Sequence, residues 1–346
     1  METNLRLVAT IILLLCTSAT SADATKLQRE APASLYLTNI FFVSATQGWM
    51  LGSTSDTTYI LYTKDGGETW TKQHETTVGL FDIKFVSDQV GWAVGSSGTV
   101  LHTSDSGVTW ERQVSGTTAL LAGLATINTN TAWIAGANGT MLFTENGGKT
   151  WTACKVNTNV SLSDISFADA RHGIAVGYGV ILLSNDGGKT WETKSSGEWR
   201  QLSSVLIVNE CKGWITVGPI ILRTTDGSKT LHESIPPSQG QVTGLSFVDA
   251  QRGWVAKSRG EEGDTAHIRK SGKLSSESFI LSTSDGGISW QEQLHIKSEK
   301  DHDAWVTSIF FIDQSRGWVV GRNNLIYKTV DGGKKWNKTG TVVQLR

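Results

Sequence analysis

The stretch SNDGGKTW, Ser184 to Trp191, is short, polar and rich in glycine, and near copies of it recur along the chain. Each copy places Ser or Thr first, an acid third, a glycine fifth and Thr-Trp or Ser-Trp last, with small departures. The seven octets are Thr63–Trp70, Thr103–Trp110, Thr144–Trp151, Ser184–Trp191, Thr224–Leu231, Thr283–Trp290 and Thr329–Trp336. Their third positions are Asp65, Asp105, Asn146, Asp186, Asp226, Asp285 and Asp331, so the steps are 40, 41, 40, 40, 59 and 46 residues.

A second signature precedes every octet and accounts for most of the remaining tryptophans. It is a small residue followed by Trp or Ile, at Gly48-Trp49, Gly91-Trp92, Ala132-Trp133, Gly173-Ile174, Gly213-Trp214, Gly253-Trp254 and Gly317-Trp318. A short run typical of a β-strand lies upstream of each pair. The second unit therefore predicts four short strands, at Leu80–Val86, Gly91–Gly95, Thr99–Thr103 and Thr109–Gln113. Four strands in a period of about 40 residues predict an all-β fold, a seven-bladed β-propeller with blades ending near the seven octets.

The octet is interpreted as the turn between the third and fourth strands of a blade. Its acid can accept hydrogen bonds from backbone N–H groups of the turn, and its glycines permit positive φ. One such acid per blade, near the outer rim, cannot converge on a single substrate. We therefore interpret these seven side chains as structural rather than catalytic or metal-binding.

The N-terminus predicts export. Arg6 precedes the apolar run Leu7–Leu15, and Ala22-Asp23-Ala24 ends the segment as a cleavage site would. We expect a signal peptide at residues 1–24, a linker at 25–34 and the propeller at 35–346. Lipidation at Cys16 is an alternative, although Leu15 before it is unusual for a lipoprotein.

Charge and cysteines narrow the class of partner. Without residues 1–24 the chain has 30 basic and 30 acidic residues (31 − 1 and 32 − 2), which argues against a nucleic-acid partner. Cys154 and Cys211 lie on non-adjacent repeats, so we favour free thiols over a disulfide. No cysteine spacing indicates a metal, and the close spacing of His295, Asp301, His302 and Asp303 fits no rigid element; we expect no cofactor.

The full unit, FVSDQVGWAVGSSGTVLHTSDSGVTW at Phe85–Trp110, is more particular than the octet. The octets alone resemble the Asp-box of sialidases, sortilin-type receptors and some glycosidases. The whole unit is similar to the photosystem II stability and assembly factor family of cyanobacteria and chloroplasts and to its bacterial relatives, over residues 35–339. That resemblance implies an exported seven-bladed propeller, on the lumenal side of a photosynthetic membrane or in the periplasm, that binds a membrane-protein client during assembly.

The irregular segments of the chain fall on one predicted face. Connectors between blades and loops between second and third strands share this side, here called the loop face. It carries an insertion at Lys257–Ser278 and a long connector at Gln291–Trp305. Trp199, with its neighbour Arg200, and Trp305 end such connectors and are candidate partner-binding residues. The alternatives are that both tryptophans fill gaps in the fold and that the insertion is a solvated loop.

The opposite side, here called the octet face, offers a second candidate surface. Arg171, Arg252 and Arg316 precede the small residue of the second signature in blades four, six and seven. They would form a basic patch for acidic loops of a client. The alternative is that they pair with Asp169, Asp249 and Asp313, which lie just upstream.

An enzyme of the sialidase or glycosidase type is the competing hypothesis, with glycan binding beside it. Asp82 and Asp164 occupy equivalent positions in the first strands of blades two and four and would line the channel. The other blades hold Asn39, Gly123, Ser204, Gly244 and Ser308 there. The Arg-Ile-Pro motif of sialidases is absent from the sequence. We therefore expect a non-catalytic, monomeric scaffold, closed without a swapped strand; whether Thr341–Leu345 extends the last blade or an N-terminal segment adds an outer strand stays open.

Overall fold

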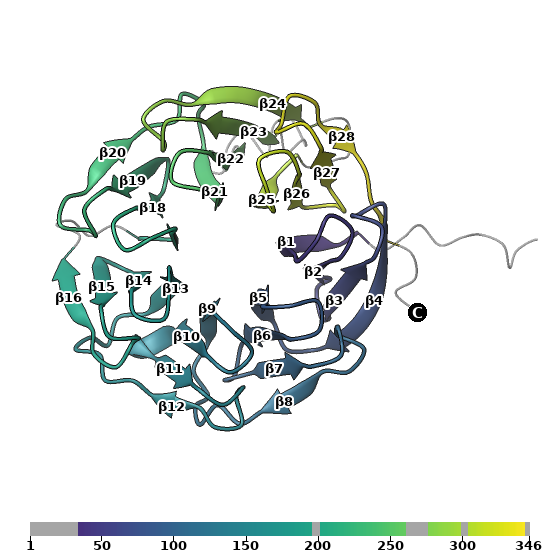
Figure 1. Cartoon of the computed structure of the whole chain (residues 1–346). Helices are drawn as coiled ribbons and strands as arrows, with labels where there is room; N and C mark the ends of the chain where they lie inside the picture. The colour runs from purple at the N-terminus through teal and green to yellow at the C-terminus, as the bar shows by residue number, and fades with distance from the viewer. Residues whose placement is uncertain (1–33, 196–200, 261–275, 299–303, 343–346) are drawn as a thin grey trace, which may run out of the picture. The chain divides into compact units, whose positions relative to one another are not determined.

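Each repeat folds into a sheet of four antiparallel strands, and seven such blades form a ring around a channel (Figure 1). The computed structural model describes residues 34–195, 201–260, 276–298 and 304–342. The innermost strands are β1 (Tyr36–Phe42), β5 (Leu80–Phe85), β9 (Leu121–Thr126), β13 (Leu162–Phe167), β17 (Ser204–Ile207), β21 (Gln241–Phe247) and β25 (Val306–Phe311). The second strands are β2 (Gly48–Ser53), β6 (Gly91–Gly95), β10 (Ala132–Gly136), β14 (Gly173–Gly177), β18 (Gly213–Val217), β22 (Gly253–Gly260) and β26 (Gly317–Gly321). The predicted fold and the number of blades are confirmed.

The outer half of each blade completes the sheet. The third strands are β3 (Thr58–Thr63), β7 (Val100–Thr103), β11 (Met141–Thr144), β15 (Val180–Ser184), β19 (Ile220–Thr224), β23 (Ser276–Thr283) and β27 (Ile326–Thr329). The fourth strands are β4 (Thr69–Thr76), β8 (Glu111–Gln113), β12 (Thr152–Ala153), β16 (Glu192–Ser195), β20 (His232–Ser234), β24 (Gln291–Lys297) and β28 (Asn337–Lys338). A 3-10 turn, η2, lies at Ala137–Gly139. No helix among the described residues is long and apolar enough to cross a membrane.

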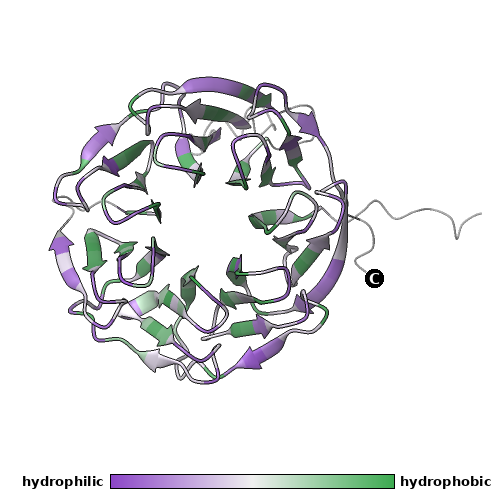
Figure 2. Cartoon of the chain, viewed as in Figure 1, coloured by the Kyte–Doolittle hydropathy of each residue, from purple (hydrophilic) through white to green (hydrophobic). Residues whose placement is uncertain are grey.

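Polarity changes from the inside of a blade to its rim. All five residues of β6, β10, β14, β18 and β26 are buried, because neighbouring blades cover both faces of these strands. The fourth strands are mostly exposed, and Figure 2 shows most of them as hydrophilic segments around the ring. The sequence therefore places its apolar residues where blades pack on one another.

Stacked aromatic rings hold five of the seven seams between blades. A phenylalanine at the end of an innermost strand lies flat on the signature tryptophan of the preceding blade, with centroids 3.5 or 3.6 Å apart. The octet tryptophan of its own blade stands edge-on to the same ring, at 5.8–6.1 Å. The pairs are Trp318–Phe42, Trp49–Phe85, Trp133–Phe167, Trp214–Phe247 and Trp254–Phe311. The repeated tryptophans thus serve packing between blades.

The ring is closed by a strand from the C-terminal end, so the prediction of closure without a swapped strand is wrong. β29 (Thr341–Val342) does not extend the last blade but pairs in parallel with Thr69 and Trp70 on the outer edge of β4. Gly340 turns the chain at φ 89°, and the Thr339 hydroxyl donates to Glu68 at 2.8 Å. Closure in this way satisfies backbone groups on an edge that would otherwise face water.

Blade six differs from the sequence interpretation in a second respect. Both ends of the predicted insertion are strand, because β22 and β23 stay paired out to Gly260 and Ser276. The first part of the predicted connector Gln291–Trp305 is likewise strand, since β24 runs from Gln291 to Lys297. The elongation therefore builds a taller blade, and residues 261–275 and 299–303 lie outside the described residues.

Candidate functional site

The octet acids are hydrogen-bonded within their own turns. In blade one, the Thr63 hydroxyl donates to Asp65 at 2.7 Å and accepts from the Gly67 N–H at 2.9 Å, while Asp65 accepts the Thr69 N–H at 2.9 Å. The same bonds recur in the other six octets. The N–H of Thr230 is the main reason that the pKa of Asp226 is lowered to about 2. The six aspartates and Asn146 therefore act as hydrogen-bond acceptors that fix the turn.

Two seams lack the stacked phenylalanine, and both contain a channel carboxylate instead. Blades three and five have Thr126 and Ile207 at that position. Asp82, one blade earlier, accepts the Leu124 N–H of blade three at 2.9 Å. Asp164 accepts the Val205 N–H of blade five at 2.9 Å. The acids therefore link neighbouring blades at the two seams that lack the phenylalanine.

Both acids lie in the central channel, as predicted. The channel has a volume of about 480 Å³. Lys84, which the sequence analysis missed, lies there too, with its Nζ 3.5 Å from Asp82. Its signal was its spacing: residues two apart on a strand share a face. Burial raises the pKa of Asp82, and burial together with Asp82 raises the pKa of Asp164 to about 6.

Their hydrogen bonds favour a structural role for these carboxylates. Asp82 accepts from the Asn39 side chain at 2.8 Å and from the Ile83 N–H at 2.9 Å, besides the Leu124 N–H. Asp164 accepts from the Ser204 hydroxyl at 2.7 Å and from the Ile165 N–H at 2.8 Å. A glycosidase pair needs its carboxylates directed at the scissile bond. Here the carboxylates accept hydrogen bonds from backbone N–H groups and from the side chains of Asn39 and Ser204.

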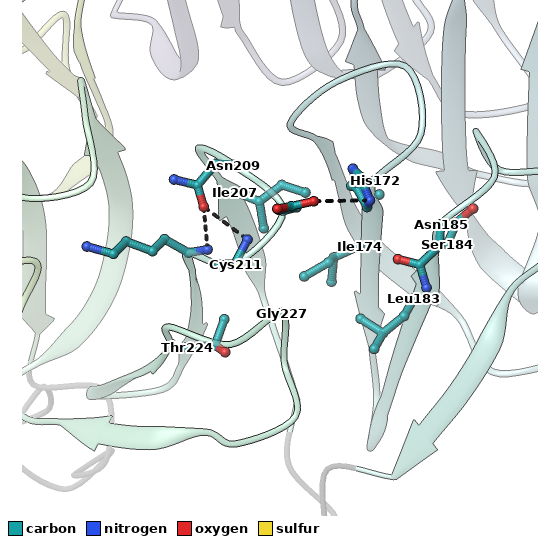
Figure 3. Close-up of a pocket in the computed structure, with 13 residues that line it drawn as sticks. His172, Ile174, Leu183, Ser184, Asn185, Ile207, Asn209, Cys211, Thr224 and Gly227 are labelled. Carbon is teal, nitrogen blue, oxygen red and sulfur yellow. Dashed lines mark hydrogen bonds and ion pairs between the residues drawn. The ribbon is translucent and has the colours of Figure 1, made fainter.

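The seam between blades four and five opens on the octet face as a small pocket (Figure 3). Its volume is about 40 Å³, enough for a few water molecules and well below the size of an organic substrate site. Ile174, Leu183 and Ile207 form its apolar wall. At its rim His172 contacts Asp169 at 2.8 Å and Glu210 of the next blade at 3.7 Å. The pocket occupies the seam in which an isoleucine replaces the signature tryptophan.

The three candidate arginines of the octet face are held near their own turns. Arg252 pairs with Asp249 at 2.8 Å, and Arg316 pairs with Asp313. Arg171 donates instead to the Asn185 carbonyl at 3.3 Å, because Asp169 is taken by His172. The side chains of Arg252 and Arg316 are nearly half exposed. Their role in binding a client stays a prediction.

On the loop face the structure describes one of the three predicted residues. Trp305 is half-buried, and the Arg322 guanidinium lies 4.8 Å from its ring centroid. The same guanidinium lies 5.4 Å from the ring of Tyr36, which is 39% exposed. Arg322 and Tyr36 were missed by the sequence analysis, because they come from opposite ends of the chain. Trp199 and Arg200 lie outside the described residues.

The cysteines and acids show no metal chemistry within the described part of the chain. Cys154 and Cys211 are free thiols, and burial raises the pKa of Cys154 to about 11. In the ranges described, no three His, Cys, Asp or Glu side chains gather as metal ligands would. His295 contacts Glu277 at 3.5 Å, and the other members of the predicted cluster, Asp301, His302 and Asp303, lie outside the described residues.

Seven four-stranded blades with octet turns define an Asp-box propeller, and comparison with known proteins places it more narrowly. The family model described as photosynthesis system II assembly factor YCF48 matches residues 71–161, 149–239 and 268–345. The BNR/Asp-box repeat model matches residues 61–72. Because the first match covers more than half of the chain, the protein belongs to the YCF48 family of photosystem II assembly factors.

Solved structures show the same fold at low sequence identity. "YCF48 bound to D1 peptide" is 19% identical with a TM-score of 0.65, covering 86% of this chain and 93% of that chain. YCF48 from Cyanidioschyzon merolae is 19% identical with a TM-score of 0.63, covering 87% and 97%. The GH74 enzyme of Niastella koreensis is 14% identical with a TM-score of 0.65, covering 87% of this chain and 53% of that chain. Comparison with curated protein sequences gives no match.

Proposed function

We propose that this protein is a non-enzymatic scaffold that binds a peptide segment of a membrane-protein client, in the manner of a photosystem II assembly factor. The observation that carries the proposal is the family match, which extends over three segments from blade one to the C-terminal end. A YCF48 structure with a D1 peptide supports a protein client rather than a glycan. The engagement of Asp82 and Asp164 with backbone N–H groups agrees with a scaffold.

Export is part of the same proposal. Removal of residues 1–24 would release a mature chain that begins at Thr25 and meets its client on the lumenal or periplasmic side of a membrane. The sequence order of Arg6, the apolar run and Ala22-Asp23-Ala24 supports this. N-terminal sequencing of the protein recovered from its host would give Thr25 first; an intact Met1 would contradict export by this signal.

Titration of the purified protein with the D1 peptide tests the client. Saturable binding that a scrambled peptide does not reproduce is expected. Two variants then decide the face: Trp305→Ala changes the loop face, whereas the Arg252→Ala/Arg316→Ala double variant changes the octet face. Loss of affinity in one of them assigns the site. Absence of binding by the wild-type chain would remove the D1-type client from the proposal, and a glycan array would then test the competing function.

A further inference from the structure

The outer edge of blade six is unusual for its length. β24 has seven residues and β4 has eight, whereas the other fourth strands, β8, β12, β16, β20 and β28, have two to four. The last strand of a blade exposes unpaired backbone N–H and C=O groups on its outer side. Short strands limit that exposure, and only blades one and six depart from this pattern. Both long strands lie on the rim of the ring in Figure 1.

One of the two long edge strands already pairs with a further strand of this chain. On β4, β29 pairs as a fifth strand, in parallel with Thr69 and Trp70. On β24, by contrast, no described strand pairs with the outer side, and the sheet order ends there as β21-β22-β23-β24. The outer edge of β4 is thus covered at Thr69 and Trp70 by a strand of this chain, whereas no described strand covers the outer edge of β24.

The direction of the backbone groups on β24 follows from its register. Lys297 is opposite Glu277, and the Ser298 N–H donates to the Ser276 carbonyl at 3.0 Å. In an antiparallel pair, hydrogen-bonded and non-hydrogen-bonded residues alternate. Ser298 and Ile296 therefore bond inward to β23, whereas the N–H and C=O groups of His295 and Lys297 point away from the sheet.

The two strands next to this edge, β22 and β23, are hydrogen-bonded to blade seven. Hydroxyls of the paired strands form a column on the side facing blade seven, where Ser258 and Ser278 lie 2.7 Å apart. Ser258 donates to the Val306 carbonyl at 2.8 Å, and Ser276 accepts the Ala304 N–H at 2.7 Å. The tall half of blade six is thus bonded to the entry of blade seven, which preorganises the strand for a partner.

We propose that the outer edge of β24, from Leu294 to Lys297, binds an extended peptide segment of the client as a fifth strand. The inference rests on the proposed function and adds to it the mode of binding. Main-chain hydrogen bonds to His295 and Lys297 supply affinity, as in other complexes formed by strand addition.

The side chains of the edge specify the chemistry of the peptide. Lys297 is exposed, and His295 lies beside it on the same face. The nearest described acid, Glu277, is bonded to Arg259 at 2.7 Å and also contacts His295 at 3.5 Å. Leu294 and Ile296 point the other way and pack in the apolar cluster of blades six and seven. Cross-strand pairing therefore favours a segment that alternates acidic and apolar residues, with the acids next to His295 and Lys297.

A defined probe tests the inference: a seven-residue peptide of alternating valine and glutamate with blocked ends, titrated against the full chain. The decisive variant is Lys297→Pro, which removes one outward N–H, and its matched control is Lys297→Ala, which removes only the side chain. Proline is tolerated on edge strands, and the residue before it, Ile296, is already extended as proline requires. Equal melting temperatures of the two variants show that the fold is kept.

We expect the wild-type chain to bind the probe. The affinity of Lys297→Pro should be roughly tenfold lower than that of Lys297→Ala, because a lost hydrogen bond costs at most about that much affinity. Equal affinities of the two variants would overturn strand addition at β24. Failure of the wild-type chain to bind the probe would also overturn it. Binding of the D1 peptide is measured separately, so the proposed function stands or falls by its own result. If Lys297→Pro has a lower melting temperature than Lys297→Ala, a probe methylated on alternate backbone nitrogens is used in place of the variant. Unchanged affinity of the wild-type chain for the methylated probe would contradict the proposal.

Discussion

The seam between blades three and four is built on stacked rings, whereas the seam between blades four and five is built on aliphatic side chains and the half-buried carboxylate of Asp164. In the first, Trp133 lies flat on Phe167 at 3.6 Å, and its indole N–H donates to the Gly187 carbonyl at 3.0 Å. In the second, Ile174 and Ile207 occupy the corresponding positions, and Leu231 replaces the octet tryptophan. Asp164 supplies the polar link instead, by accepting the Val205 N–H.

The two channel acids compensate for the missing ring stacking. Asp82 and Asp164 lie in the blades that precede the two seams without a phenylalanine. A carboxylate that accepts two or three hydrogen bonds can hold neighbouring strands together where ring stacking is missing. Paired acids inside a propeller therefore have a structural explanation here, and the two seams provide matched positions at which to test it.

The largest effect is expected from Trp133→Ala in the aromatic seam. The ring is 1% exposed, stacked on one face and hydrogen-bonded at its nitrogen. Its removal should lower the free energy of unfolding by about 4 kcal/mol. The matched change Ile174→Ala should cost only about 2 kcal/mol, because its seam already contains a cavity. Urea unfolding of both variants measures the difference; equal losses would contradict the contrast between the seams.

The second effect concerns the fifth position of the octet. A Cβ on Gly188 would lie 2.5 Å from the Trp133 indole nitrogen, at φ 79°. Gly188→Ala should therefore destabilise the protein by about 2 kcal/mol. The equivalent residue of blade five is Ser228 at φ 67°, with a buried hydroxyl that has no partner. Ser228→Gly should stabilise by up to about 1 kcal/mol. A loss of stability in Ser228→Gly would show that the serine contributes a contact of its own.

The third effect is a coupling between the two changed positions of the aliphatic seam. Ile174→Trp alone should crowd the Ser228 side chain, as a side chain at Gly188 would crowd Trp133. Together with Ser228→Gly, the new indole has room and the Gly227 carbonyl as acceptor. A double-mutant cycle should give a favourable coupling of about 1 kcal/mol. Additive effects would mean that the side chains at positions 174 and 228 do not affect each other's packing.

The features that lie within one repeat could be predicted from the sequence. The octets, the signature pairs and the strand runs specify the blades, because each of these residues acts within its own blade or against its neighbour. Features that depend on the closed ring could not be predicted from the sequence. Closure of β29 on β4 joins residues far apart in sequence, and nothing local distinguishes it from a continued last strand.

The candidate site was predictable to a smaller extent. Asp82 and Asp164 were placed in the channel by their equivalence, but their bonds to Leu124 and Val205 depend on how blades meet. The extension of blade six looked like a loop, since polar residues such as those at Lys257–Gly260 seldom signal a strand. Pairing with β23 outweighs their local preference.

The smallest effect expected is a change in pH dependence at Asp164. Its pKa is raised to about 6 by burial and by Asp82, whereas an unfolded aspartate titrates near about 4. Between these values the folded state holds a proton that the unfolded state has lost, so this group makes the protein more stable as the pH falls from about 6 to about 4. The octet acids have the opposite effect on stability, and at lower pH. Asp226, with a pKa of about 2, stabilises the folded state near neutral pH, and this contribution is lost only as the pH falls below about 4.

Asp164→Asn removes this titration while keeping a side-chain oxygen for the Val205 N–H. The free energy of unfolding at pH 4.5 minus that at pH 7 should therefore be smaller in the variant than in the wild type. Groups that do not interact with Asp164 change equally in both proteins and cancel in the comparison, whereas Asp82 is coupled to Asp164, so the difference reports on the two carboxyl groups together. Ser166→Ala is the matched control in the same seam, because its hydroxyl also accepts a backbone N–H of blade five, from Ile207 at 3.2 Å, but does not titrate. If the control shifts the pH dependence as much as Asp164→Asn does, the effect comes from loosening the seam rather than from the carboxyl proton.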